Sequence, residues 1–215
     1  SFELQIEQPQ LWWPNGLGEP HLYHVAFIIR MEQQEITRQA FDIGVRTIEV
    51  VSQTDDDGEA FYFKINGEPV FIKGANYIPS DSFLAEVSPQ KLEQLILDAK
   101  DANINMLRVW GGGIYESDAF YSLASKHGLL IWQDFMFACS LYPGDEHFIE
   151  NVKKEAVSNI RRLRNFPCVA MWCGNNEIEM GIDKWDWPQK FNYTEPQFEQ
   201  LKEDYRLVFH KLLPQ

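Results

Sequence analysis

Cysteine is scarce in this sequence, and the few cysteines form no recognisable pattern. Three occur in 215 residues, Cys139, Cys168 and Cys173, with the spacing of neither a disulfide framework nor a metal-binding pair. Their apolar neighbours predict packed thiols. The five histidines are scattered without a metal-ligand spacing. We therefore expect no metal site, and nothing in the sequence implies a cofactor.

Long hydrophobic runs are also missing. The apolar runs at 25–29 and 129–132 are far shorter than the roughly 20 residues that a membrane helix needs, so we expect no membrane span. The first residues, 1–4, show no targeting signal.

Basic residues are outnumbered, 19 Lys and Arg against 32 Asp and Glu, and the formal net charge is −13. This balance disfavours nucleic acid and anionic membranes as partners, because both are polyanions. A neutral substrate fits it better. Aromatic residues make up 14% of the chain; they could stack on sugar rings or fill the core, and composition leaves both interpretations open.

The first part of the chain predicts a β-rich module. Alternating patterns indicate strands at 2–6, 22–30, 36–43 and 45–51, and the polar stretch 52–59 marks a domain boundary. About four strands are fewer than a β-sandwich normally uses. Residues 1–51 therefore predict part of a larger β domain.

Residues 60–215 predict an α/β domain. A hairpin with an Asn66-Gly67 turn comes first, and strands then alternate with helices, the signature of a parallel sheet. The first predicted strand ends near Asn76, and the other three cover 105–110, 129–134 and 168–173. The predicted helices cover 88–99, 118–127, 145–164 and 194–212. Four such units are half of a (β/α)8 barrel. We expect the missing strands to come from sequence outside this chain.

Polar residues stand at the carboxyl ends of the predicted strands, where parallel barrels place their chemistry. They are Asn76, Arg108 with Trp110, Asp134, and Asn176 with Glu177. Glycoside cleavage needs one carboxylic acid and a second carboxylate. Glu177 and Asp134 are both candidates by position, and on neighbouring strands each would influence the pKa of the other. Asn176 could donate a hydrogen bond to a sugar hydroxyl.

Four motifs in order give the chain a family resemblance: Gly74-Ala75-Asn76-Tyr77-Ile78-Pro79, Arg108-Val109-Trp110-Gly111-Gly112-Gly113, Trp132-Gln133-Asp134-Phe135-Met136-Phe137 and Trp172-Cys173-Gly174-Asn175-Asn176-Glu177. Together they resemble the β-mannosidases of glycoside hydrolase family 2. The resemblance implies that residues 1–51 close an immunoglobulin-like β-sandwich and that residues 60–215 form the first half of a TIM barrel.

The resemblance also implies roles for single residues. Glu177 matches the catalytic general acid/base, and Asn176 matches the asparagine that contacts the sugar's 2-position. The other matches are substrate-binding residues: Asp134, which holds substrate hydroxyls, Trp110, a wall of the −1 subsite, Trp185, at the mouth of the site, and Asn76, on its rim.

The expected function is removal of terminal β-D-mannose from the non-reducing ends of β-mannosides, with retention of configuration. The family nucleophile is a glutamate on a later strand, and nothing before Gln215 matches it. We therefore expect these residues to be inactive alone and to need the remainder of their polypeptide. The alternatives are a sister activity (β-galactosidase, β-glucuronidase or exo-β-glucosaminidase) and a carbohydrate-binding fragment without turnover. Cytoplasm, periplasm and lysosome remain open as compartments, with the bacterial cytoplasm favoured.

Overall fold

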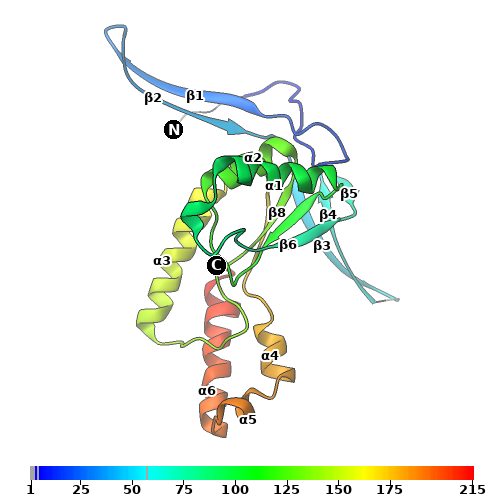
Figure 1. Cartoon of the computed structure of the whole chain (residues 1–215), viewed down its shortest axis with the longest axis vertical. Coiled ribbons are helices and arrows are strands. Elements are labelled where there is room, and N and C mark those ends of the chain that lie inside the picture. The colour runs from blue at the N-terminus through cyan, green and yellow to red at the C-terminus, as the bar shows by residue number, and fades with distance from the viewer. Residues whose placement is uncertain (1–2, 4, 57) are drawn as a thin grey trace.

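The computed structural model describes residue 3, residues 5–56 and residues 58–215. The strands in this part of the chain form three sheets: a two-stranded hairpin, a three-stranded antiparallel sheet and a four-stranded parallel sheet. Figure 1 shows the hairpin at one end of the molecule and the last helices at the other, with the parallel sheet between them.

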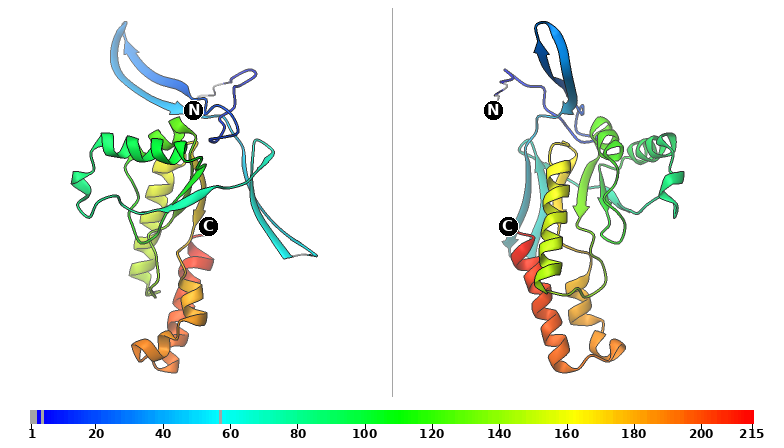
Figure 2. Two further views of the ribbon diagram at one scale, coloured as in Figure 1. Left: turned by 45° about the vertical axis from the view of Figure 1, so that its right-hand side comes forward. Right: turned by 90° about the vertical axis from the view of Figure 1, so that its left-hand side faces the viewer.

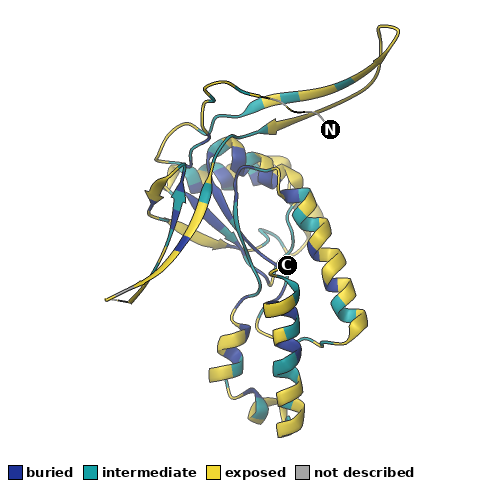
Figure 3. Cartoon of the chain, turned by 180° about the vertical axis from the view of Figure 1, so that it is seen from behind, coloured by how far each residue is buried: buried dark blue, intermediate teal, exposed yellow. Residues whose placement is uncertain are grey.

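The hairpin consists of β1 (Tyr23–Met31) and β2 (Gln34–Ile43) and projects away from the rest of the chain (Figure 2). Its two turn residues, Glu32 and Gln33, have φ values of 48° and 75°, as the common two-residue hairpin turn requires. These strands confirm the predictions at 22–30 and 36–43. Most of the hairpin is exposed (Figure 3), including several large apolar side chains: Phe27, Ile29, Met31, Ile36 and Phe41.

The strand predicted at 2–6 is not found. Residues 2 and 4 lie outside the described residues, and residues 3, 5 and 6 belong to no strand.

The second sheet crosses the predicted domain boundary. It consists of β3 (Ile48–Asp55), β4 (Gly58–Ile65) and β5 (Glu68–Val70), in that order. Because β3 pairs with β4 along its whole length, the polar stretch 52–59 is the end of a long hairpin and not a linker. The turn at Asn66 and Gly67, with φ values of 53° and 83°, confirms the predicted hairpin. Residues 48–51 therefore share a sheet with 58–70, and the division into domains at 51 and 60 stays a prediction.

The parallel sheet confirms the predicted βα alternation. Its strands are β6 (Gly74–Tyr77), β7 (Met106–Val109), β8 (Leu130–Asp134) and β9 (Val169–Cys173), and they are neighbours in chain order. A short 3-10 turn (Leu84–Glu86) and α1 (Pro89–Asp101) connect β6 to β7, α2 (Asp118–His127) leads to β8, and α3 (Glu146–Leu163) leads to β9. Because the strands are parallel, their carboxyl ends lie along one edge.

Local side chains set the ends of these helices. The Ser88 hydroxyl accepts the Lys91 N–H at the start of α1, and the Asp145 carboxylate accepts the Phe148 N–H at the start of α3. Gly128 ends α2 with a φ of 74°, a left-handed conformation that glycine adopts without strain.

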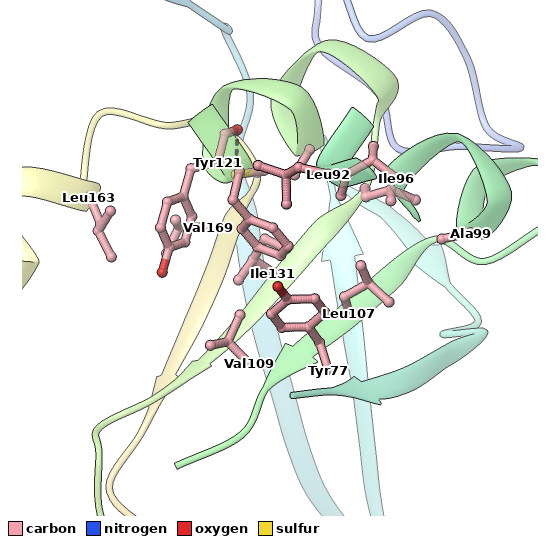
Figure 4. Close-up of a cluster of buried hydrophobic side chains, with 14 residues drawn as sticks. Tyr77, Leu92, Ile96, Ala99, Leu107, Val109, Tyr121, Ile131, Leu163 and Val169 are labelled. Atoms are coloured by element: carbon pink, nitrogen blue, oxygen red, sulfur yellow. Dashed lines mark hydrogen bonds between the residues drawn. The ribbon is translucent and has the colours of Figure 1, made fainter. Parts of the chain in front are cut away.

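The main core lies between the parallel sheet and helices α1 and α2 (Figure 4). Apolar residues spaced three or four apart face the sheet from each helix. This burial fixes the strands, and with them the residues that follow their carboxyl ends. Among the buried members are Leu92, Ile96, Leu107, Phe120, Tyr121, Ile131 and Val169.

The chain ends in a helical segment far from the hairpin (Figure 1). It contains α4 (Ile178–Lys184), α5 (Trp187–Phe191), α6 (Glu195–Arg206) and a π-helical turn (Leu207–Leu212). The predicted capping box of Thr194 and Gln197 starts α6, whereas the two short helices α4 and α5 were not predicted. None of the described helices has the length and apolarity that crossing a bilayer requires.

A loop in the N-terminal part binds to the helices that cover the sheet. The buried Trp12 indole N–H donates to the Ser125 carbonyl at 2.8 Å. Asn15 Nδ2 donates to the carbonyls of Lys100, at 3.0 Å, and Ile104, at 2.9 Å, and so satisfies acceptors at the end of α1.

We predict that Asn15→Ala destabilises the protein by about 1–3 kcal/mol, because it removes both hydrogen bonds that join the loop to the end of α1 and to the Ile104 carbonyl. Urea unfolding followed by far-UV circular dichroism measures the change. The control is Asn151→Ala, at an exposed position on α3. Equal unfolding midpoints for the two variants would show that Asn15 does not fasten the loop.

Candidate functional site

Three side chains from neighbouring strand ends meet at the carboxyl edge of the parallel sheet. Arg108 belongs to β7, Asp134 is the last residue of β8, and Asn176 lies three residues after β9. Hydrogen bonds from the Arg108 guanidinium reach both other residues. The structure thus brings together residues that the sequence places 26 and 68 positions from Arg108.

Asp134 is the centre of this cluster. It is fully buried, at 0% exposure, and its carboxylate accepts four hydrogen bonds. Arg108 Nε and Nη2 donate at 3.1 and 2.9 Å, the Trp132 indole at 2.9 Å and the Gly111 amide at 3.0 Å. Each carboxylate oxygen receives two of these bonds, so the charge is paired and its lone pairs are used.

These four hydrogen bonds make Asp134 a fixed point for the guanidinium, the indole and the Gly111 amide around it. The role of holding substrate hydroxyls, which the family resemblance implies for Asp134, stays a prediction.

Arg108 orients the amide of Asn176, and Asn176 in turn contacts Glu177. A guanidinium has only donors, so the amide turns its oxygen towards Arg108, at 3.0 Å from Nη2. This fixes the amide nitrogen, which donates to Glu177 Oε2 at 3.3 Å. Asn176 is buried, with 6% exposure, whereas Glu177 is exposed. A rigid cluster thus holds a carboxylate that solvent can reach.

Glu177 has a strained backbone. Its φ and ψ are 60° and 13°, in the left-handed region, and it is the residue from which α4 starts. Non-glycine residues in this region cost on the order of 1–2 kcal/mol, and they cluster at functional sites. The Gly181 amide donates to the Glu177 carbonyl at 2.9 Å, which continues the helix from this residue.

Two of the three glycines after Trp110 are explained by close packing. A Cβ atom on Gly111 would lie 2.5 and 2.7 Å from the carbonyl oxygens of Phe137 and Phe135, and one on Gly112 would lie 2.0 Å from the Trp110 ring. The half-buried indole of Trp110 therefore folds back over Gly112. This geometry accounts for these two glycines by packing alone.

The remaining predicted residues lie nearby, outside the hydrogen-bonded cluster around Asp134. Asn76 is exposed on β6 and lines an open hollow of about 340 Å³ together with Arg108 and Trp132. Trp185 is the residue that caps the carboxyl end of α4, about 12 Å along the helix axis from Glu177 at the other end. Its ring packs on Gly181 and lies edge-to-face with Trp187, with centroids 5.6 Å apart.

The cysteine prediction is right for one residue and wrong for another. Cys168 is fully buried, and burial raises the pKa of its thiol to about 12. Cys173 is half-buried, and burial raises the pKa of its thiol, with a further contribution from the Asp134 carboxylate. Cys139 is exposed rather than packed, and its sulfur lies 3.7 Å from Glu177 Oε2.

Sequence reasoning did not assign a role in the site to Trp132, Arg108 or Cys139. Trp132 could have been found, because residues two apart on a strand share a face and Trp132 precedes Asp134 by two. Arg108 was identified at a strand end but not as the partner of Asp134. Among the described residues, no three His, Cys, Asp or Glu side chains form a group able to hold a metal ion.

Comparisons with known proteins agree on one family. A family model described as "Glycosyl hydrolases family 2" matches residues 1–46. Beta-mannosidase B of Neosartorya fischeri is 38% identical over 214 residues, 99% of this chain and 25% of that protein. Beta-mannosidase of Rattus norvegicus is 44% identical over 175 residues, 80% of this chain and 20% of that protein.

Among solved structures, the crystal structure of the β-D-mannosidase from Dictyoglomus thermophilum matches with a TM-score of 0.81 and 43% identity, covering 96% of this chain and 26% of that one. The chain therefore spans about a quarter of the length of its relatives, or less.

We predict that Gly112→Ala displaces the Trp110 ring and destabilises the protein by about 1–3 kcal/mol, as overpacking does. Near-UV circular dichroism reports the ring environment, and urea unfolding reports the stability. The control is Gly174→Ala, where an added Cβ meets only a Phe209 carbon at an ordinary 3.6 Å. An unchanged near-UV spectrum and a midpoint equal to that of the control would contradict this prediction.

Proposed function

Because the chain belongs to glycoside hydrolase family 2, as a fragment related to its β-mannosidases, we propose that it supplies the acid/base half of a retaining β-mannosidase site. The observation that supports this most is the exposed carboxylate of Glu177, which Asn176 holds at the carboxyl end of a parallel sheet. A general acid needs both features, since it must be accessible to substrate and fixed in position.

The architecture that we propose is half of a (β/α)8 barrel, from residue 60 to residue 215, preceded in residues 1–51 by the closing strands of an immunoglobulin-like sandwich. Four parallel strands in chain order, each followed by helical sequence, support the first part. Strands β6 and β9 occupy the two edges of this sheet. The partner that completes the barrel is the remainder of the same polypeptide, which is several times longer in the relatives.

In the proposed reaction, Glu177 first transfers its proton to the glycosidic oxygen while the bond from that oxygen to the anomeric carbon breaks. A second carboxylate attacks the anomeric carbon from the opposite face and forms a glycosyl ester. Glu177, now ionised, then takes a proton from water as the water oxygen attacks the same carbon. Two inversions leave mannose in its original β configuration, and the second carboxylate is regenerated.

Asp134 does not serve as the second carboxylate in this proposal. Its two oxygens are buried and hydrogen-bonded to protein groups, which leaves neither free to attack a sugar. We assign the nucleophile to the part of the polypeptide outside these 215 residues. The chain alone is then expected to lack turnover.

The proposed substrate is a β-mannoside or the β-mannosyl end of an oligosaccharide. The identity to proteins named β-mannosidase, 38% and 44%, supports mannose over the sugars of sister activities. Asn176 is the residue proposed to contact the 2-hydroxyl, since its amide nitrogen lies beside the Glu177 carboxylate. Trp110 and Trp185 provide the aromatic faces of the site, and Asn76 its rim.

We predict that Glu177→Gln, made in the full-length polypeptide, slows hydrolysis of alkyl β-mannosides by more than about a hundredfold and leaves KM within about threefold, because a missing proton donor removes roughly 10²–10⁴ in rate. Aryl mannosides with good leaving groups need little protonation, so their first step should slow far less. The ratio kcat/KM, which reports the steps through cleavage of the glycosidic bond, measures the difference between the two substrate classes.

The matched control is Glu179→Gln, at an exposed carboxylate two residues further along, which should leave both rates nearly unchanged. If Glu177→Gln lowered kcat/KM for activated and unactivated mannosides by the same factor, the assignment of Glu177 as the acid would be wrong.

A further inference from the structure

Resting on the proposed role of Glu177, we infer that Cys139 is a positioning residue for the acid/base carboxylate. The proposal is that the thiol of Cys139 and the amide of Asn176 together hold the Glu177 side chain in its working orientation. No sequence motif and no metal-ligand spacing predicted a functional role for Cys139.

Three side-chain contacts form a closed triangle. The Cys139 sulfur lies 3.7 Å from Glu177 Oε2, the Asn176 amide nitrogen lies 3.4 Å from that sulfur, and the same nitrogen lies 3.3 Å from Oε2. Oε2 therefore has two neighbours able to donate, one from each of two loops. Removing either leaves the side chain with a single restraint.

The backbone brings these two loops together by pairing. The loop after β8 and the loop after β9 form a short parallel bridge between Ala138 and Asn176. The backbone N–H of Asn176 donates to the backbone carbonyl of Phe137 at 2.9 Å, and the backbone N–H of Cys139 donates to the backbone carbonyl of Asn176 at 3.0 Å. This pairing fixes the position of Cys139 relative to Glu177 without any contribution from the sulfur.

Both residues at the contact have left-handed backbones. The φ of Cys139 is 50° and that of Glu177 is 60°. Two strained non-glycine residues facing each other together cost on the order of 2–4 kcal/mol, and such strain persists only where the surrounding structure enforces it. The exposed thiol fills no core space, so packing does not explain why a cysteine stands in this conformation.

A thiol suits a carboxyl group that changes its protonation state in each cycle. Sulfur is a weak donor and a weak acceptor, so it can donate to the ionised carboxylate and accept from the protonated acid. A strong donor would favour the ionised form and hinder its use as an acid. The contact therefore orients the Glu177 side chain without favouring either its protonated or its ionised form.

The experiment compares Cys139→Ala and Cys139→Ser with the parent in the full-length polypeptide. We expect Cys139→Ala to lower kcat for an alkyl β-mannoside about fivefold to tenfold, as the loss of roughly 1 kcal/mol predicts. For an activated aryl mannoside the rate constant of the glycosylation step should fall less than twofold. The KM values of both substrates should be unchanged. Cys139→Ser should recover part of the lost rate, since a hydroxyl can also donate and accept.

The matched control is Ser140→Ala, at the exposed neighbour whose hydroxyl donates to the Leu141 carbonyl; it should leave the hydrolysis of both substrates unaffected. Equal losses on the two substrates, or no loss on either, would overturn the role of Cys139. If Cys139→Ala does not fold, methylthiolation of the exposed thiol in the folded parent tests the same contact, and the loss should reverse on reduction. A methylthiolated enzyme of unchanged activity would also overturn it.

The outcomes separate this inference from the proposed function. If Glu177→Gln shows the dependence on leaving group but Cys139→Ala does not, only the role of Cys139 fails. If Glu177→Gln itself shows no such dependence, the acid/base assignment fails and Cys139 loses its proposed task with it.

Discussion

The ion pair between the partly exposed Arg108 and the fully buried Asp134 is the interaction on which the candidate site depends. A carboxylate with no exposed surface is stable only when its charge is paired and its oxygens are bonded, and Asp134 meets both conditions with four donors. Removing one partner of such a pair typically costs about 3–5 kcal/mol. The pair also fixes Arg108, which orients the side-chain amide of Asn176. That amide donates a hydrogen bond to Glu177, so the solvent-exposed carboxylate is held in position as well.

Close backbone approach and local strain surround this pair. Gly111 donates its amide to Asp134 from a position where a side chain would collide with two carbonyl groups. Cys139 and Glu177 both adopt left-handed backbones on facing loops. These features raise the free energy of the folded chain locally, and the hydrophobic core between the sheet and α1 and α2 offsets them. The rigid sheet thus supports a site made largely of residues just beyond its strands.

Much of the fold could be predicted because local signals agreed with the pattern of apolar residues. Helix α2 was predicted at its observed bounds, since Gly128 supplies a clear left-handed end. The polar stretch 52–59 did not reveal that β3 and β4 form one hairpin, because an exposed hairpin end and a linker have the same composition. Helix α4 was missed because it is short and starts from a strained residue that no propensity favours. Glu177 and Asn176 could be identified from their motif, whereas the contact with Cys139 depends on two loops meeting in space, which no spacing encodes.

Azide rescue of Glu177→Ala, in the full-length polypeptide with an activated aryl β-mannoside, tests most directly whether Glu177 is the acid/base of a retaining site. Azide attacks the glycosyl ester without a general base, so it should restore turnover where water cannot. We expect faster release of the aryl group with added azide and a mannosyl azide product of β configuration. No rescue, or a product of α configuration, would contradict this assignment.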